Sequence, residues 1–258
     1  MNEHNERTKQ RNEEARDADV IFGRNPVLEA IKSGRPLDRL LVARGEHSGS
    51  VPQIVALAVQ AGVPVKDVDR KKLDFLCGHG NHQGVAAVGA VKAYGTVDDL
   101  FAEAERRGEP PFFVICDEIE DPHNLGAIIR TAEAAGAHGM IVPKRRSAPL
   151  SGVVAKTSAG AVEFLPIARV ANLTQTIAQL KERGVWVYCA DMDGEPYDKA
   201  NLTGPIALVV GSEGSGVGRL VKETCDGVLS LPMKGRINSL NASVAAGILL
   251  YEIARRRD

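Results

Sequence analysis

The sequence lacks the features that would assign a protein to the membrane, to the secretory route or to a disulfide-stabilised class. No apolar stretch among its 258 residues is long enough to cross a bilayer, and the N-terminus has no apolar core of the kind that signal peptides carry. The four cysteines are scattered, with no Cys-x-x-Cys pair, and three lie in or beside apolar runs. We therefore expect a cytoplasmic protein with free buried thiols and no membrane contact.

Excess charge of either sign is also missing. The formal net charge is −1, so the total neither favours nor excludes a nucleic-acid partner, and the distribution matters more. Basic residues gather in four places: 35–44, 70–72, 144–146 and 255–257. A single cluster of this kind is usually just a solvated face, whereas several around one crevice would favour RNA, because phosphate contacts supply most non-specific affinity.

Several familiar site patterns are absent as well. The glycine-rich segment 214–219 contains no Gly-Lys-Ser/Thr, so it is not a Walker phosphate loop, and no Gly-x-Gly-x-x-Gly follows an early strand. No Ser/His/Asp or paired-carboxylate arrangement stands out. The segment Cys77-Gly78-His79-Gly80-Asn81-His82-Gln83 offers only three metal ligands at a spacing that fits no zinc pattern. We expect no metal there, and a polar loop whose amide and imidazole groups can contact splayed RNA bases.

The first part of the chain predicts a polar tail followed by a small α/β domain. Residues 1–19 are almost wholly polar and charged, so we expect them to be disordered. Residues 20–91 then alternate short strands with helices, the first helix being capped by Asn25 with Pro26 at its first position. Residues 92–111 are expected to be a linker that contains a charged helix over 97–107.

Residues 112–258 are typical of a larger α/β domain. Continuous apolar runs stand at 112–116, 140–142, 185–188 and 206–210, a short, mainly apolar strand is expected at 227–231, and 164–167 is strand-like. Helical segments such as 125–135 separate them. Strands buried on both faces read as uninterrupted apolar runs, so the pattern predicts a mostly parallel sheet covered by helices on both faces. Ligands bind such sheets in the crevice at the carboxyl ends of the strands.

Two of these strands open into loops of small and polar residues. The run 206–210 leads into Gly211-Ser212-Glu213-Gly214-Ser215-Gly216, and the run 227–231 leads into a loop that ends in an Ala/Leu-rich helix. Ser239 or Asn241 can cap that helix by accepting a bond from an unpaired N–H of its first turn. Both loops offer bare backbone to a ligand, and Glu213 is the one carboxylate in them.

The segments GSEGSGVGRL (211–220) and LPMKGRINSLNASVAAGILLYE (231–252) resemble motifs two and three of the SpoU, or TrmH-type, RNA ribose 2′-O-methyltransferases of the SPOUT superfamily. The segment DEIEDPHNLGAIIRTA (117–132) resembles motif one. The likeness covers residues 112 to 256. Residues 20–91 resemble the ribosomal-protein-like substrate-binding domain of the RlmB branch, which methylates a guanosine ribose in 23S rRNA.

The resemblance carries expectations about fold, cofactor and partners. It implies a C-terminal trefoil knot, S-adenosylmethionine as methyl donor, RNA as substrate and a homodimer. In the family motifs, Arg130 is the essential catalytic group. The resemblance also implies catalytic roles for Asn124, Glu213, Ser239 and Asn241. It implies cofactor binding by Gly211, Leu231, Met233 and Leu240.

The chemistry of these side chains leaves structural alternatives open. A guanidinium is a poor base because of its high pKa, so we expect Arg130 to hold the target phosphate and lower the pKa of the adjacent 2′-oxygen. It could instead form a surface salt bridge to Glu133 or Glu118. Asn124 could orient the catalytic turn or cap the helix, and Glu213 could align Arg130 or brace its own loop.

Two rival functions remain. A tRNA methylase of the TrmH kind would usually lack the α/β N-terminal domain. A non-catalytic RNA-binding protein would have no need of the complete set of motif residues.

Overall fold

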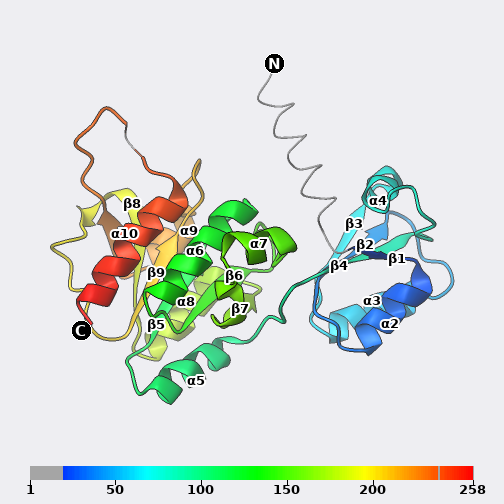
Figure 1. Ribbon diagram of the computed structural model, residues 1–258, viewed down its shortest axis with the longest axis horizontal. Helices are drawn as coiled ribbons and strands as arrows, with labels where there is room; N and C mark the ends of the chain where they lie inside the picture. Colours follow the sequence, from blue (N-terminus) through cyan, green and yellow to red (C-terminus); the bar gives the residue numbers. More distant parts are fainter. Residues whose placement is uncertain (1–19, 238, 258) are drawn as a thin grey trace. The chain divides into compact units, whose positions relative to one another are not determined.

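The computed structural model describes residues 20–237 and 239–257, which form two compact units. One unit runs up to Ala93 and includes Pro149–Val153, and the other comprises Tyr94–Ala148 and the chain from Val154 onward (Figure 1). The tail expected at residues 1–19 lies outside the described residues. No helix within the described part of the chain is both long and apolar enough to cross a membrane.

The first unit is a four-stranded mixed sheet with helices on both faces. The sheet order is β1-β4-β2-β3, with β4 antiparallel to β1 and β2, and β3 parallel to β2. Leu40 packs against α2 and α3 on one face, and Leu41 packs against α4 on the other. The elements are β1 (Val20–Phe22), α2 (Arg24–Lys32), β2 (Leu37–Ala43), α3 (Val51–Gln60), β3 (Val65–Val68), α4 (Arg70–Leu76) and β4 (Val85–Gly89).

The start of α2 differs from the expectation. Asn25 is not the cap, because the helix already begins at Arg24 and its N-cap is Gly23, which makes no side-chain cap bond. Gly23 has a φ of 92°, a left-handed conformation that turns the chain directly from β1 into the helix. The N–H of Arg24 donates to Oε1 of Gln83 at 3.0 Å, so a side chain from a distant loop takes the place of a local cap.

The second unit is a six-stranded sheet in the order β10-β8-β9-β5-β6-β7, and every neighbouring pair is parallel. This confirms the predicted fold class of a parallel sheet flanked by helices. The elements are α5 (Val97–Arg107), β5 (Phe112–Cys116), α6 (Pro122–Ala134), β6 (Gly139–Pro143), α7 (Gly152–Thr157), a 3-10 turn (Ala161–Glu163), β7 (Ile167–Val170), α8 (Leu173–Glu182), β8 (Trp186–Pro196), β9 (Ile206–Val210), α9 (Arg219–Thr224), β10 (Gly227–Ser230) and α10 (Ala242–Arg255).

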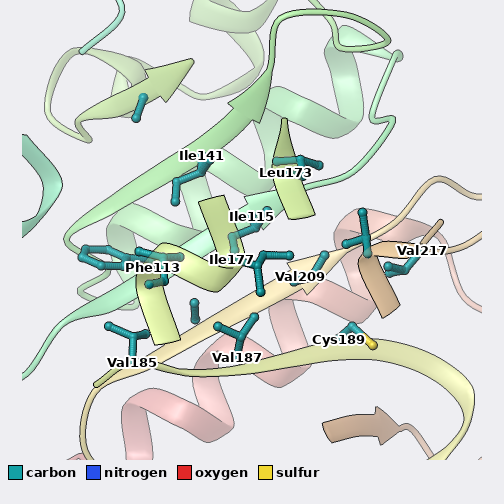
Figure 2. Close-up of a cluster of buried hydrophobic side chains, with 14 of the residues drawn as sticks. Phe113, Ile115, Ile141, Leu173, Ile177, Val185, Val187, Cys189, Val209 and Val217 are labelled. Atoms are coloured by element: carbon teal, nitrogen blue, oxygen red, sulfur yellow. The ribbon is translucent and has the colours of Figure 1, made fainter. Parts of the chain in front are cut away.

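Alternate residues of the central strands point into two different layers. Phe113 and Ile115 of β5 face a core formed with α5, α8 and α9, in which Ile177 is fully buried (Figure 2). On the opposite face α6 and α10 pack against each other and against the sheet. Because β5 and β9 are buried along their whole length, the loops that follow them are held in place by the core.

Two stretches of this unit differ in detail from the sequence analysis. The strand expected at 164–167 is wrong: β7 begins at Ile167, and the side chain of Phe164 is 74% exposed. Pro166 lacks an N–H for the sheet ladder and contributes only its carbonyl oxygen, which accepts the N–H of Met140. Within the expected linker, α5 is present and its Leu100 is fully buried in the core.

Candidate functional site

The candidate site lies where three loops meet at the carboxyl edge of the parallel sheet. The first loop joins β5 to α6, the second joins β9 to α9, and the third joins β10 to α10. Strands β5 and β9 are hydrogen-bonded neighbours and both point toward this edge. Segments about a hundred residues apart in the sequence are therefore brought side by side.

Helix α6 begins earlier than the apolar pattern suggested. Its N-cap is Asp121, whose Oδ1 accepts the N–H of His123 at 2.8 Å, and Pro122 occupies the first helical position. The capping interpretation of Asn124 is therefore wrong. Asn124 lies within the first turn, and its side chain is free to point toward the β9 loop, with only 8% of the residue exposed.

Asn124, Glu213 and Asn241 form one hydrogen-bonded cluster. Nδ2 of Asn124 donates to Oε1 of Glu213 at 2.9 Å, and Nδ2 of Asn241 donates to Oδ1 of Asn124 at 3.0 Å. Asn241 also donates to Oε1 of Glu213. The first turn of α6, the β9 loop and the N-cap of α10 each contribute one side chain, and the two amides fix the orientation of the carboxylate.

Asn241 has a second role that is compatible with the first. It is the N-cap of α10, where its Oδ1 accepts the N–H groups of Ser243 at 2.9 Å and Val244 at 3.3 Å. The capping prediction is confirmed for Asn241 and not for Ser239. Since the amide oxygen serves the helix and the amide nitrogen serves the cluster, one side chain ties the start of α10 to Glu213.

The β9 loop closes tightly on itself. The N–H of Ser212 donates to the carbonyl of Gly216 at 3.1 Å, and the N–H of Gly216 donates back at 2.9 Å. A Cβ on Gly211 would lie 2.1 to 2.3 Å from backbone atoms of Gly216 and Val217, so only glycine fits there. Gly211 therefore allows the close backbone contact with Gly216 and Val217 that closes the loop.

Sequence reasoning missed Asp117, which joins two of the loops. Its Oδ2 accepts the N–H of Gly218 at 2.8 Å, so the end of β5 is tied to the start of α9. Burial raises the pKa of this carboxyl above its ordinary value. The sequence did contain a signal for this residue, because Asp117 directly follows the five apolar residues of β5.

A cavity of about 240 Å³ adjoins this cluster. Apolar side chains of Val210, Leu229 and Leu249, which are almost fully buried, form part of its wall. Among the described residues around the cavity, the charged ones are the two carboxylates Asp191 and Glu213. Apolar walls with negative charge suit a ligand that carries apolar faces and positive charge. All four expected cofactor residues line it, together with one expected catalytic hydroxyl: Gly211, Leu231, Met233, Leu240 and Ser239.

The structure does not bring Arg130 to this cavity. Arg130 is exposed and lies six residues after Asn124, about 9 Å farther along α6 and on another face of the helix. Its side chain makes no hydrogen bond or ion pair with any residue that the structure describes, Glu133 included. Glu118 pairs instead with Arg146, whose NH1 lies 2.5 Å from Oε1.

In the first unit, the loop 77–83 is organised around a buried imidazole. His82 is 3% exposed; its Nε2 lies 2.9 Å from Oδ1 of Asp74, and its Nδ1 accepts the N–H of Gly84 at 3.0 Å. His79 and Asn81 are exposed on the same loop. The described residues contain no group of three side chains that could hold a metal ion.

Two family models match the chain. Residues 111–251 match the SpoU rRNA Methylase family, and residues 20–95 match a model described as RNA 2′-O ribose methyltransferase substrate binding. The Bacillus subtilis (strain 168) protein YacO, whose name places it among TrmH family tRNA/rRNA methyltransferases, is 50% identical over 93% of this chain and 96% of its own length.

Three solved structures of similar fold cover between 61% and 99% of this chain. An AdoMet-bound rRNA methyltransferase from Sinorhizobium meliloti is 29% identical with a TM-score of 0.56, covering 96% of this chain and 90% of its own. The SpoU methyltransferase AviRb from Streptomyces viridochromogenes, in complex with the cofactor AdoMet, is 26% identical with a TM-score of 0.58. The match covers 99% of this chain and 94% of the AviRb chain. A TrmH/SpoU tRNA-modifying enzyme from A. aeolicus is 28% identical with a TM-score of 0.51, covering 61% of this chain and 83% of its own.

Proposed function

The chain belongs to the SpoU rRNA methylase family, and from this premise we propose that it transfers a methyl group from S-adenosylmethionine to the ribose 2′-hydroxyl of a guanosine in 23S rRNA. The observation that carries the proposal is the cluster of Asn124, Glu213 and Asn241 beside a negatively lined cavity. A binding protein without catalytic function would not need a carboxylate fixed by two amides next to a ligand cavity.

The cavity fits the proposed cofactor in charge and in polarity. S-adenosylmethionine carries a sulfonium group and an amino-acid end with both an ammonium and a carboxylate, so its net charge is positive, and it supplies the methyl group when bound. Gly211 brings bare backbone to the cavity, while Leu231, Met233 and Leu240 contribute apolar side chains that can flank the adenine. The S. meliloti and AviRb structures were both solved with AdoMet, which supports the same cofactor here.

The expected catalytic side chains have different roles toward the ribose hydroxyl that receives the methyl group. A ribose hydroxyl hardly ionises at neutral pH, so transfer requires stabilisation of the developing negative charge on its oxygen. Arg130 would hold the target phosphate through paired N–H donors and lower the pKa of the neighbouring 2′-oxygen. Glu213, fixed by Asn124 and Asn241, and the hydroxyl of Ser239 would orient the nucleotide at the mouth of the cavity.

An exposed apolar face supports a homodimer. Val244, Ile248 and Tyr251 follow one face of α10, with exposed fractions of 50%, 40% and 55%. Helix α10 packs against α6, and a Cβ on Gly247 would lie 3.6 Å from Cγ2 of Thr131, the neighbour of Arg130. We propose that a second copy covers this face, which would enclose Arg130 in the same interface.

The remaining expectations also stand as proposals. We propose a trefoil knot formed by the chain around the cavity, a cytoplasmic location, and domain limits at 20–91 and 112–258 joined by 92–111. The match of residues 20–95 to a substrate-binding model supports RNA contact by the first unit, in which the exposed residues His79, Asn81 and Gln83 of the loop 77–83 form a candidate surface.

The choice between rRNA and tRNA rests on the N-terminal unit. The tRNA-modifying enzyme from A. aeolicus covers 61% of this chain, whereas the S. meliloti rRNA methyltransferase covers 96%. The name of YacO leaves both substrates open. The additional unit therefore favours a large structured RNA over tRNA.

Mapping of ribose methylation in RNA from cells that lack the protein tests the proposal. One guanosine of 23S rRNA should lose its 2′-O-methyl group and regain it with the wild-type gene, but not with Arg130→Ala. Unchanged 23S rRNA together with loss of a ribose methyl from tRNA would establish the TrmH-type rival. If calorimetry showed no uptake of S-adenosylmethionine by the purified chain, the binding-protein rival would stand instead.

A further inference from the structure

Asp191 is a fixed carboxylate on the wall of the cavity that the family motifs do not include. It is the middle residue of β8 (Trp186–Pro196), two residues past Cys189, the last β8 residue that pairs with β9, and Ala190 and Met192 on either side of it also line the cavity. Its Oδ2 accepts Lys222 Nζ at 3.0 Å, and its Oδ1 accepts the N–H of Met192 at 2.6 Å. With both oxygens held and 22% of the side chain exposed, the carboxylate is oriented before any ligand arrives.

The sheet order separates Asp191 from the proposed methyl-transfer end. Strand β9 lies between β5 and β8, and neighbouring strands are about 4.8 Å apart. Helix α6, which carries Asn124 in its first turn, follows β5, and β5 lies roughly 10 Å across the sheet from β8. In a nucleoside whose reacting group is on the 5′-carbon, the ribose hydroxyls lie on the far side of the sugar from that group.

The charge around Asp191 selects hydroxyl groups over a cation. Lys222 already compensates the carboxylate, and it also bonds Oδ1 of Asp193 at 2.5 Å. A ligand ammonium placed there would be repelled by Lys222, whereas neutral O–H groups can donate to the free lone pairs of the carboxylate. The β9 loop lies close to this carboxylate: a Cβ on Gly216 would be 3.8 Å from Oδ2 of Asp191, which is ordinary van der Waals contact.

We propose that Asp191 accepts hydrogen bonds from the vicinal 2′- and 3′-hydroxyls of the cofactor ribose, and that Lys222 is the positioning residue that orients it. This inference rests on the proposed use of S-adenosylmethionine. It gives the adenosine end of the cavity one charged side-chain contact, in addition to the backbone and apolar contacts expected from the motifs.

Calorimetry with two ligands tests the assignment without reference to turnover. The ligands are 5′-methylthioadenosine, which lacks the amino-acid portion, and its 2′,3′-dideoxy analogue. Asp191→Asn should weaken binding of the diol ligand by about 10-fold or more and leave the dideoxy ligand unchanged, because hydrogen bonds to a charged group are the stronger kind. Asp193→Asn is the matched control: it shares Lys222 but does not line the cavity, so both affinities should stay within about twofold.

The affinity for the diol ligand is compared with the affinity for the dideoxy ligand on the same variant protein. Because a partial loss of folded protein affects both measurements equally, it does not change their ratio. Lys222→Met should give the same diol-selective loss at smaller size, because it disorients the carboxylate without removing it. Equal losses for the two ligands would overturn the assignment while leaving the proposed function intact. A loss seen only with S-adenosylhomocysteine, measured as a third ligand because it carries the ammonium group, would do the same. If the wild-type chain bound neither S-adenosylmethionine nor 5′-methylthioadenosine, both proposals would fall.

Discussion

Replacement of Gly211 by alanine tests whether the closed β9 loop is set by backbone contact. The added Cβ would lie 2.1 Å from the carbonyl carbon of Gly216, 2.2 Å from its oxygen and 2.3 Å from the nitrogen of Val217. All three are backbone atoms, so no change of rotamer can relieve the overlap. The loop must open by about 1 Å or more, to the spacing at which carbon atoms normally pack.

The cost of opening can be worked from the contacts that would be lost. The two hydrogen bonds between Ser212 and Gly216 contribute about 1 kcal/mol each. Val217 is 5% exposed and belongs to the core, so its displacement adds about 1 kcal/mol. A total of about 3 kcal/mol corresponds to a fall in Tm of roughly 6–12 °C for a domain of this size.

Thermal denaturation of the full chain, followed by circular dichroism, measures this change. Gly214→Ala is the matched control, because a Cβ three residues farther along the same loop meets nothing within 4 Å and its Tm should shift by less than about 2 °C. Calorimetry should also show at least about 10-fold weaker S-adenosylmethionine binding by Gly211→Ala, since the opened loop is one wall of the cavity. Equal melting temperatures for the two variants would refute the reasoning.

Three further substitutions test the hydrogen-bonded cluster around Glu213, the exposed apolar face of α10, and the hydrogen bond from Gly218 to Asp117. Asn124→Asp places a second carboxylate beside Glu213. The methylation rate should fall about 10-fold or more at pH 8 and partly recover at pH 6, where the pair of carboxylates takes up a proton. A methylation rate of this variant that did not change with pH would count against the cluster. Ile248→Glu should convert the proposed dimer to a monomer in light scattering, while Phe164→Glu, an exposed site off α10, should not; a monomeric wild type would contradict the interface. Burial raises the pKa of Asp117, so the folded chain binds its proton more tightly than the unfolded chain, and wild-type stability declines as the pH rises from about 3.8 through the raised pKa. Asp117→Asn can still accept the Gly218 N–H without ionising, so its Tm relative to wild type should be higher at pH 7 than at pH 4, and a constant difference would contradict this account.

Strands and helices with a strong local signal could be predicted from the sequence. The apolar runs at 112–116 and 206–210 are strands β5 and β9 with the expected bounds, and α5 spans the expected 97–107. Five consecutive apolar residues can be buried on both faces only between strands that have helices on either side, so the parallel sheet followed from the pattern. The motif residues were identified through the resemblance of segments 117–132, 211–220 and 231–252 to the SpoU motifs, and not from periodicity or spacing.

Helix starts and side-chain partners depended on the tertiary structure. Several polar residues near each helix start could serve as caps, and only the path of the chain selected Gly23 over Asn25 and Asp121 over Asn124. Strand β8 continues to Pro196 because β10 pairs with it, including a register shift that no local pattern encodes.

The site itself shows the same division. The sequence determined that Asn124, Glu213 and Asn241 would lie in the segments that follow three of the predicted strands. Only the strand order placed Asn124, Glu213 and Asn241 within hydrogen-bond distance, set Asp191 against Lys222 on the cavity wall, and left Arg130 on an exposed face of α6. Local periodicity decides which residues are buried, whereas contacts between residues about a hundred positions apart depend on which strands become neighbours.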